Sequence, residues 1–237
     1  MFTLHKNPPP MARTLRVLSA LLSYPDASLR PHYAEMRELL HAEQALAAAR
    51  LAELGALIEL LERARALEAE AAYVDLFDRG RSTSLHLFEH VHGDSRERGP
   101  ALVDLGQTYA QAGLMLAEGE LPDYLPAVLE FASTLEPVKS RAFLGEMAHI
   151  LNAIFAALAE RDSAYASVLG ALLDLAGEKA QAVAPAKAPA ESLDESWAEP
   201  IAFDGCSTAG QARPGEAQPV HVVRNPSRHN ALPGARA

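Results

Sequence analysis

The sequence predicts an all-α protein, a single-domain bundle of about seven to nine helices with a disordered C-terminal tail. From about residue 11 to residue 178, apolar residues recur at i, i+3, i+4 and i+7, which is the spacing of one helix face. The alternation typical of strands is absent from this stretch. The prolines are unevenly distributed along the chain and indicate three segments. None lies between Pro31 and Pro100, and seven of the sixteen follow residue 180. We therefore expect an extended leader over residues 1–10, a helical domain over 11–180 and a mostly disordered tail over 181–237.

The predicted helices begin with a Leu stripe near the N-terminus, formed by Leu15, Leu18, Leu21 and Leu22. Asp26 then precedes a helix that carries Pro31 in its first turns or at a kink. Residues 42–72 are almost entirely Ala, Glu and Leu, which is typical of a solvent-facing helical hairpin.

The second half of the helical domain has its own start and stop signals. Pro122 and Pro137 are expected at first helical positions, and Ser163 is a candidate N-cap. Helices are expected to stop at Gly80, Gly119 and Gly177. A second apolar stripe at helical spacing is formed by Phe143, Met147, Ile150, Leu151, Ile154 and Leu158.

The tail has too few apolar side chains to fold by itself. Residues 181–237 hold nine large apolar residues, whose full burial would stabilise a fold by roughly 20 kcal/mol. Ordering 57 backbones costs at least about 1 kcal/mol each. A role for the tail as an adaptor between two proteins stays open, and truncation after residue 180 would test it.

Composition limits the compartment and the partners. No apolar run approaches the roughly 20 residues of a membrane-spanning helix, so stable membrane insertion is not expected. A single cysteine, Cys206, excludes an internal disulfide and fits a reducing compartment, so we expect a cytoplasmic protein. The net charge of −10 disfavours nucleic acid, whose phosphates need clustered Lys and Arg, and favours a basic peptide.

Two histidines near the middle of the chain raise the alternative of a metal-binding protein or a metal-dependent enzyme. His86 and His90 are four residues apart, so they share a face on a helix, and Glu89 lies close to them. His92 falls about 200° from His90 on a continuous helix and cannot reach the same ion. The order of residues is not the H-E-x-x-H of metalloproteases. Capping or ordinary hydrogen bonding is the competing interpretation, and we predict no metal.

Acidic residues around these histidines alternate with arginines, which favours a structural role for most of them. Asp94 and Glu97 also have the D-x-x-E spacing of a capping box. The chain has no G-x-S-x-G, P-loop or dinucleotide-binding motif. We therefore expect neither an enzyme nor a bound cofactor.

Residues 73–105, "YVDLFDRGRSTSLHLFEHVHGDSRERGPALVDL", resemble the nitrate reductase molybdenum cofactor assembly chaperones (NarJ-type) almost without gaps. "YVDLF" is similar to the Y-x-x-L-F element of the wider TorD/DmsD group of redox-enzyme maturation chaperones. "PDYLPAVLEF", residues 122–131, resembles that group's P-D-H-L-x-x-x-L-x-F element, with Tyr124 in place of His. "LRVLSALLSYPD" and "FLGEMAHIL" also resemble the nitrate reductase branch. The likeness covers about residues 11–176, and "ESLDESWAE" in the tail is similar as well.

The resemblance implies an all-helical, cytoplasmic and non-enzymatic chaperone. Members of this group bind the apo catalytic (alpha) subunit of respiratory nitrate reductase, including its N-terminal segment. They keep that subunit competent for molybdenum cofactor insertion and complex assembly. The resemblance therefore implies that this protein binds an unfolded client protein and takes part in nitrate assimilation. Proteins that deliver the molybdenum cofactor are further candidate partners.

An acidic helical surface with exposed aromatics would suit such a partly apolar, basic segment. We expect apolar walls from Tyr73, Phe77 and Phe88, although aromatics at helical spacing are more often core. His90 and His92, with ordinary pKa values near 6.5, could make binding depend on pH. The complete set of predicted client-binding residues is Tyr73, Asp75, Phe77, Asp78, Phe88, Glu89, His90, His92, Asp94, Glu97, Asp123 and Tyr124.

Overall fold

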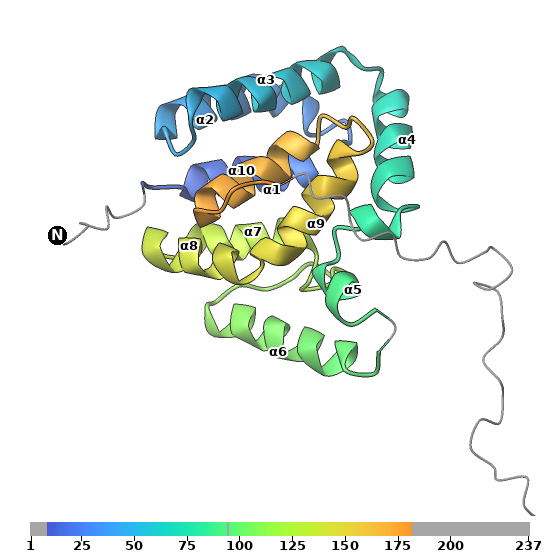
Figure 1. Ribbon diagram of the computed structural model, residues 1–237, viewed down its shortest axis with the longest axis vertical. Coiled ribbons are helices and arrows are strands. Elements are labelled where there is room, and N and C mark those ends of the chain that lie inside the picture. The colour runs from blue at the N-terminus through green and yellow to red at the C-terminus, as the bar shows by residue number, and fades with distance from the viewer. Residues whose placement is uncertain (1–8, 94, 182–237) are drawn as a thin grey trace, which may run out of the picture. The chain divides into compact units, whose positions relative to one another are not determined.

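The computed structural model describes residues 9–93 and 95–181 (Figure 1). These residues form ten α-helices and two short 3-10 helices and no strand, so the all-α prediction is confirmed. The predicted leader and tail lie outside the described residues, except for residues 9, 10 and 181.

The α-helices are α1 (Ala12–Leu22), α2 (Tyr33–Glu43), α3 (Ala48–Arg63), α4 (Ala66–Phe77), α5 (Leu87–Val91), α6 (Arg98–Gln111), α7 (Leu125–Thr134), α8 (Pro137–Glu146), α9 (Ala148–Ala159) and α10 (Ala166–Ala176). The 3-10 helices are η1 (Arg30–His32) and η2 (Arg81–Thr83).

The core of the helical body lies around α1 and α10. α10 has nine of its eleven residues buried, and α1 has seven of eleven. A helix that is apolar on most of its circumference must be surrounded by other helices. α1 packs against α7, α2 and α10, while α10 also packs against α9, α8 and α3. In Figure 1, α2 and α3 cover one side of this pair, and α7, α8 and α9 lie on the other.

The described residues form ten α-helices, one more than the predicted maximum of nine. The additional helix results from a break at Met147. The apolar stripe from Phe143 to Leu158 is divided there, between α8 and α9, and the two axes differ by 66°. Met147 has φ −95° and ψ 0°, a right-handed turn residue that is both the C-cap of α8 and the N-cap of α9. No proline marks this break, and an apolar stripe by itself does not show it.

Some predicted helix ends are confirmed and others are wrong. Pro137 is the first residue of α8, and Gly177 ends α10 in the left-handed region at φ 86°. Pro122, by contrast, is buried ahead of α7, which starts at Leu125. Gly119 also has positive φ but lies in a turn that follows no helix end. Ser163 is not the predicted N-cap, because the N-cap of α10 is Tyr165; the Ser163 Oγ instead accepts a hydrogen bond from the Tyr165 N–H at 3.4 Å in the turn before the helix.

A short crossing of two loops brings the segment before α5 against the segment before α7. The Leu125 N–H donates to the Leu85 carbonyl at 2.8 Å, and the Leu87 N–H donates to the Asp123 carbonyl at 3.0 Å. These bonds form the bridge between His86 and Tyr124. As a result, residues about 37 positions apart in the sequence share one site.

By length and composition, no single helix among the described residues could cross a membrane, whereas α8 and α9 pass that test only together, as a bent pair.

Candidate functional site

The predicted site residues of α4 point in two directions. Tyr73 and Phe77 are four residues apart and therefore share the inner face, where each is 4% exposed. Asp75 and Asp78 lie on the outside. In this structure Tyr73 and Phe77 are thus core side chains, and only the carboxylates are in direct reach of a ligand.

The inner face of α4 belongs to a chain of aromatic rings. The centroid of the Tyr73 ring lies 4.8 Å from that of Phe77 and 5.6 Å from that of Tyr24. The ring centroids of Phe77 and Tyr165 are 5.1 Å apart. The Tyr73 hydroxyl donates to the Leu22 carbonyl at the end of α1, at 2.7 Å. These contacts fix the orientation of α4, because such ring pairs add about 0.5–1.5 kcal/mol each beyond the area that they bury.

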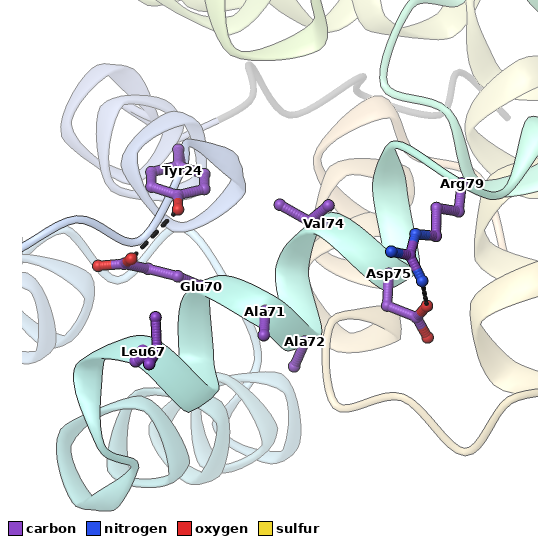
Figure 2. Close-up of a pocket in the computed structure, with 8 residues that line it drawn as sticks. All are labelled: Tyr24, Leu67, Glu70, Ala71, Ala72, Val74, Asp75 and Arg79. Carbon is purple, nitrogen blue, oxygen red and sulfur yellow. Dashed lines mark hydrogen bonds and ion pairs between the residues drawn. The ribbon is translucent and has the colours of Figure 1, made fainter.

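An open groove of about 580 Å³ runs along the outer side of α4 (Figure 2). Tyr24 and Leu67 supply its large apolar side chains and are 44% and 77% exposed. The α4 backbone is easily approached here, because Ala71 and Ala72 are small and exposed. The groove is lined by Tyr24, Leu67, Glu70, Ala71, Ala72, Val74, Asp75 and Arg79.

Two further depressions adjoin this groove and lengthen it. One of about 470 Å³ shares Ala72 and Asp75 with it and continues past Leu76 to Tyr165. The next, of about 390 Å³, shares Leu60 with the second. Leu60 is 57% exposed. The first two depressions therefore meet at Ala72 and Asp75 on α4, and the third continues from Leu60 along α3.

The groove beside α4 has two carboxylates and one guanidinium. Glu70 accepts a hydrogen bond from the Tyr24 hydroxyl at 3.2 Å, and Asp75 pairs with Arg79 at 3.2 Å. Both members of the Asp75–Arg79 pair are about three-quarters exposed, so the pair contributes little to stability and can open to another cation. Asp78, also exposed, is the C-cap residue of α4 and places a further carboxylate at the end of that helix.

The remaining predicted residues gather around a buried carboxylate before α7. Asp123 is fully buried, and one of its oxygens accepts a hydrogen bond from the Phe88 N–H at 3.1 Å. The other lies 3.4 Å from Nδ1 of His86, and the Arg98 guanidinium approaches within 3.7 Å. A buried carboxylate requires such partners, because an unpaired charge in the interior is costly.

The pKa shifts of this pair follow from the same contacts. The hydrogen bond to Asp123 raises the pKa of His86 above its ordinary value, against the opposing effect of burial. Burial raises the pKa of Asp123, but hydrogen bonds from His86 and from the Phe88 N–H outweigh it, so the net pKa is lowered. Both shifts favour a protonated imidazole beside an ionised carboxylate.

Glu89 and His90 complete this polar cluster. The carboxylate of Glu89 accepts from the Ser84 hydroxyl at 2.6 Å and from Arg98 at 3.3 Å. His90 lies with Nε2 at 2.9 Å from the Ser84 carbonyl. Because a carbonyl oxygen only accepts, the hydrogen of His90 is placed on Nε2. These residues hold the turn between η2 and α5.

The other predicted residues stand closer to solvent. Phe88 is half-buried and meets the His92 ring edge-on at 5.6 Å. Glu97 is exposed just before α6, and its side chain makes no cap bond. Asp94, the other half of the predicted capping box, lies outside the described residues.

The predicted residues therefore form two groups, one on α4 and one around Asp123. Tyr124 connects them, because its hydroxyl lies 3.2 Å from that of Tyr73. Sequence reasoning missed Tyr24, Leu67 and Glu70 as groove residues. For Leu67 and Glu70 the available signal was helical spacing, which places residues 67, 70, 71 and 74 on one face of α4.

The metal alternative finds no geometric support in the described part of the chain. No group of three His, Cys, Asp or Glu side chains there is arranged to hold an ion. His86 and His90, expected on one helix face, separate because His86 precedes α5 and faces Asp123 while His90 turns to Ser84.

Comparison with known proteins identifies relatives over most of the helical body. The profile of the family described as nitrate reductase delta subunit matches residues 34–171. The nitrate reductase molybdenum cofactor assembly chaperone NarJ of Escherichia coli (strain K12) is 46% identical over 162 residues, which are 68% of this chain and 69% of that protein. The probable chaperone of the same name from Bacillus subtilis (strain 168) is 34% identical over 163 residues, covering 68% of this chain and 86% of the relative.

A solved structure shows the same fold. The crystal structure of a putative redox enzyme maturation protein from Archaeoglobus fulgidus superposes with a TM-score of 0.50 at 20% identity, covering 75% of this chain and 98% of that one. At this level of identity the match supports the helical architecture alone. The profile match and the 46% identity confirm the resemblance found in residues 73–105, and the chain therefore belongs to the nitrate reductase delta subunit family.

Proposed function

We propose that this protein is a cytoplasmic chaperone for molybdenum cofactor assembly of a nitrate reductase and does no bond-making chemistry of its own. Its client would be the apo catalytic subunit, held competent for cofactor insertion and complex assembly. The relatives named as assembly chaperones support this role. Proteins that deliver the cofactor are further candidate partners.

The observation that carries the proposal is the groove beside α4. Its open apolar side chains, Tyr24 and Leu67, lie next to the carboxylates of Glu70 and Asp75. A short, partly apolar segment with basic residues, such as the client's N-terminal segment, would bury its apolar side chains there and place its cations against the acids. A series of three open depressions that share lining residues from α4 to α3 suits a peptide better than a compact small molecule.

The predicted residues around Asp123 would then act in a different way. Asp123 is fully buried, and the Glu89 carboxylate already accepts hydrogen bonds from Arg98 and Ser84. We propose that these side chains, with His86 and Tyr124, position α4 and the turn before α5. Direct contacts with the client would come from Asp75, Asp78 and the groove residues, with Phe88, His92 and Glu97 close enough to solvent to extend the surface.

Calorimetry with a peptide copying the N-terminus of the client catalytic subunit tests this site. The affinity of a releasing chaperone should lie between micromolar and nanomolar, roughly −8 to −12 kcal/mol. Glu70→Gln/Asp75→Asn should weaken binding about tenfold and reduce its salt dependence, because two partly exposed charge contacts are lost. The matched control is Glu118→Gln/Glu146→Gln, which removes two exposed carboxylates that do not line the groove.

Each result has a definite meaning. Equal weakening by both pairs would show a general charge effect and would reject the groove as the site. Unchanged affinity in the groove variant would reject the acidic contacts. Failure of the full-length protein to co-purify with the apo catalytic subunit would reject the chaperone role itself.

A further inference from the structure

α6 is packed less closely against the body than the other long helices. Only Tyr109 is buried among its fourteen residues, whereas α7 buries eight of ten. Val103 is 58% exposed, and Leu102 and Leu105 are half-buried. Among the described helices, the pairs that pack extensively do not include α6. Figure 1 shows it at the edge of the body, beyond α7 and α8. Since an isolated helix of this length is marginal in water, α6 depends on the contacts at its ends.

The N-terminal end of α6 is held by one guanidinium. Arg98, the first residue of the helix, lies 3.3 Å from a carboxylate oxygen of Glu89 and 3.7 Å from one of Asp123. Its Nε is buried without a hydrogen-bond partner in the described structure. This anchor is therefore electrostatic and incompletely satisfied, unlike an apolar contact that would fix the helix along its length.

The C-terminal end of α6 is held by one phenol. The Tyr109 hydroxyl donates to the Pro122 carbonyl at 2.9 Å, and its ring lies 4.9 Å from the ring of Phe131 on α7. A small cavity of about 60 Å³ adjoins both rings, so packing here is imperfect. Losing the Tyr109 contact would uncover Phe131, which is 6% exposed in the closed arrangement.

The segments on either side of α6 contain glycines suited to a hinge. Gly93 before the helix has φ 51°, and Gly113 after it has φ 79°. A methyl group at either position would meet no other atom within 4 Å. Glycine changes between positive and negative φ at little cost, so the chain can turn at both places without disturbing packed neighbours.

We propose that α6 is a latch: it opens as a unit about Gly93 and Gly113 while the core around α1, α7 and α10 stays folded. Arg98 and Tyr109 hold it closed. The surface uncovered by opening is aromatic at Phe131 and bordered by Glu120 and Glu130. No Lys or Arg occurs from Gly99 to Val138, so this opened surface is suited to an apolar segment carrying basic residues. The latch goes beyond the proposed function and does not depend on the groove beside α4.

Hydrogen exchange measured by mass spectrometry on the full chain tests the latch without any client. In the wild type, amides of residues 98–111 should exchange at least about tenfold faster than those of residues 125–134, because they open locally rather than by global unfolding. Tyr109→Phe removes only the phenol anchor and should speed exchange in α6 severalfold more, leaving α7 and α10 unchanged. Arg98→Gln should act in the same direction from the other end.

The control is Arg65→Gln, which removes an exposed ion pair with Glu68 far along the chain and should leave α6 unchanged. Arg98→Gln alone is not decisive, because it also removes a partner of buried Asp123 and can lower global stability. Tyr109→Phe avoids this difficulty. Equal exchange rates in α6 and α7 in the wild type and in both anchor variants would overturn the proposal.

Discussion

The hydroxyl oxygens of Tyr73 and Tyr124 lie 3.2 Å apart beneath the last carbonyl of α1, that of Leu22. Carbonyls at a helix end lack partners within the helix, so an outside donor is needed. Tyr73 is 2.7 Å from the Leu22 oxygen and Tyr124 is 3.5 Å from it. Tyr73 therefore donates to Leu22, and Tyr124 donates to Tyr73. Burial raises the pKa of Tyr73 far above its ordinary value, which keeps the donor protonated.

Tyr73→Phe should lower the free energy of unfolding by about 1–2 kcal/mol. The change removes a buried hydroxyl and leaves the Leu22 carbonyl with only the longer contact to Tyr124. Urea denaturation measures the loss. Tyr24→Phe is the control, because the Tyr24 hydroxyl bonds Glu70 at an exposed position and should change stability by less than about 0.5 kcal/mol. Equal losses in the two variants would contradict the network.

Asp123→Asn should lower stability by about 2 kcal/mol, since His86 and Arg98 lose the negative charge that faces them. The loss stays below that of a fully buried pair because His86 and Arg98 are 34% and 24% exposed and can be partly hydrated. Urea denaturation at pH 6 is the measurement. Asp174→Asn, at a carboxylate that is 38% exposed and pairs with Arg50, provides the comparison and should cost less than about 1 kcal/mol.

The stability contribution of the His86–Asp123 pair should depend on pH. The raised pKa of His86 gives stability that is complete below about pH 6.5 and is lost as pH rises through the folded-state pKa. The lowered pKa of Asp123 gives stability that is present above about pH 3.9 and is lost as pH falls through its folded-state pKa. The pair therefore stabilises most between about pH 4 and 6.5.

His86→Gln should consequently destabilise the protein more at pH 6 than at pH 8.5. Urea titrations at several pH values, compared with the wild type, give the difference directly. His149→Gln changes an exposed imidazole on α9 and serves as the matched variant. A difference between His86→Gln and wild type that grows with pH would contradict the assigned sign.

Leu67→Ser should weaken binding of the client's N-terminal peptide about tenfold while leaving stability unchanged. Leu67 is 77% exposed, so its loss costs the folded protein little, but a bound peptide would cover it. Calorimetry measures affinity and urea denaturation measures stability. Val138→Ser removes an apolar side chain that is 57% exposed on α8 and should alter neither. A peptide that binds Leu67→Ser as tightly as wild type does not use the groove.

Gly177→Ala and Gly55→Ala should change stability in opposite directions. Gly177 has φ 86°, and an added methyl would meet the Arg141 guanidinium, so alanine there should cost about 1 kcal/mol or more. Gly55 lies within α3 with nothing near its added methyl, and alanine should stabilise by about 0.5–1 kcal/mol. Thermal unfolding of the two variants provides the measurement. Shifts of the same sign would contradict the local conformations.

The sequence by itself determined the features that depend on neighbours along the chain. Helical spacing identified the apolar stripes of α1 and α9, Pro137 marked the start of α8, and Gly177 marked the end of α10. The motif in residues 73–105 identified the family. Each of these signals is local, because backbone preference and periodicity act over a few residues.

The tertiary structure alone decided which of the predicted residues can meet a ligand. Periodicity placed Tyr73 and Phe77 on one face of α4, but only the contacts with the Leu22 carbonyl at the end of α1 and with Tyr165 ahead of α10 made that face the buried one. In the groove, the Tyr24 hydroxyl donates to Glu70, which is 46 positions away in the sequence. The Phe88 N–H donates to Asp123, which is 35 positions away. A helical pattern states that a face is apolar and does not state which distant helix covers it, so contacts of this range follow from packing the whole body.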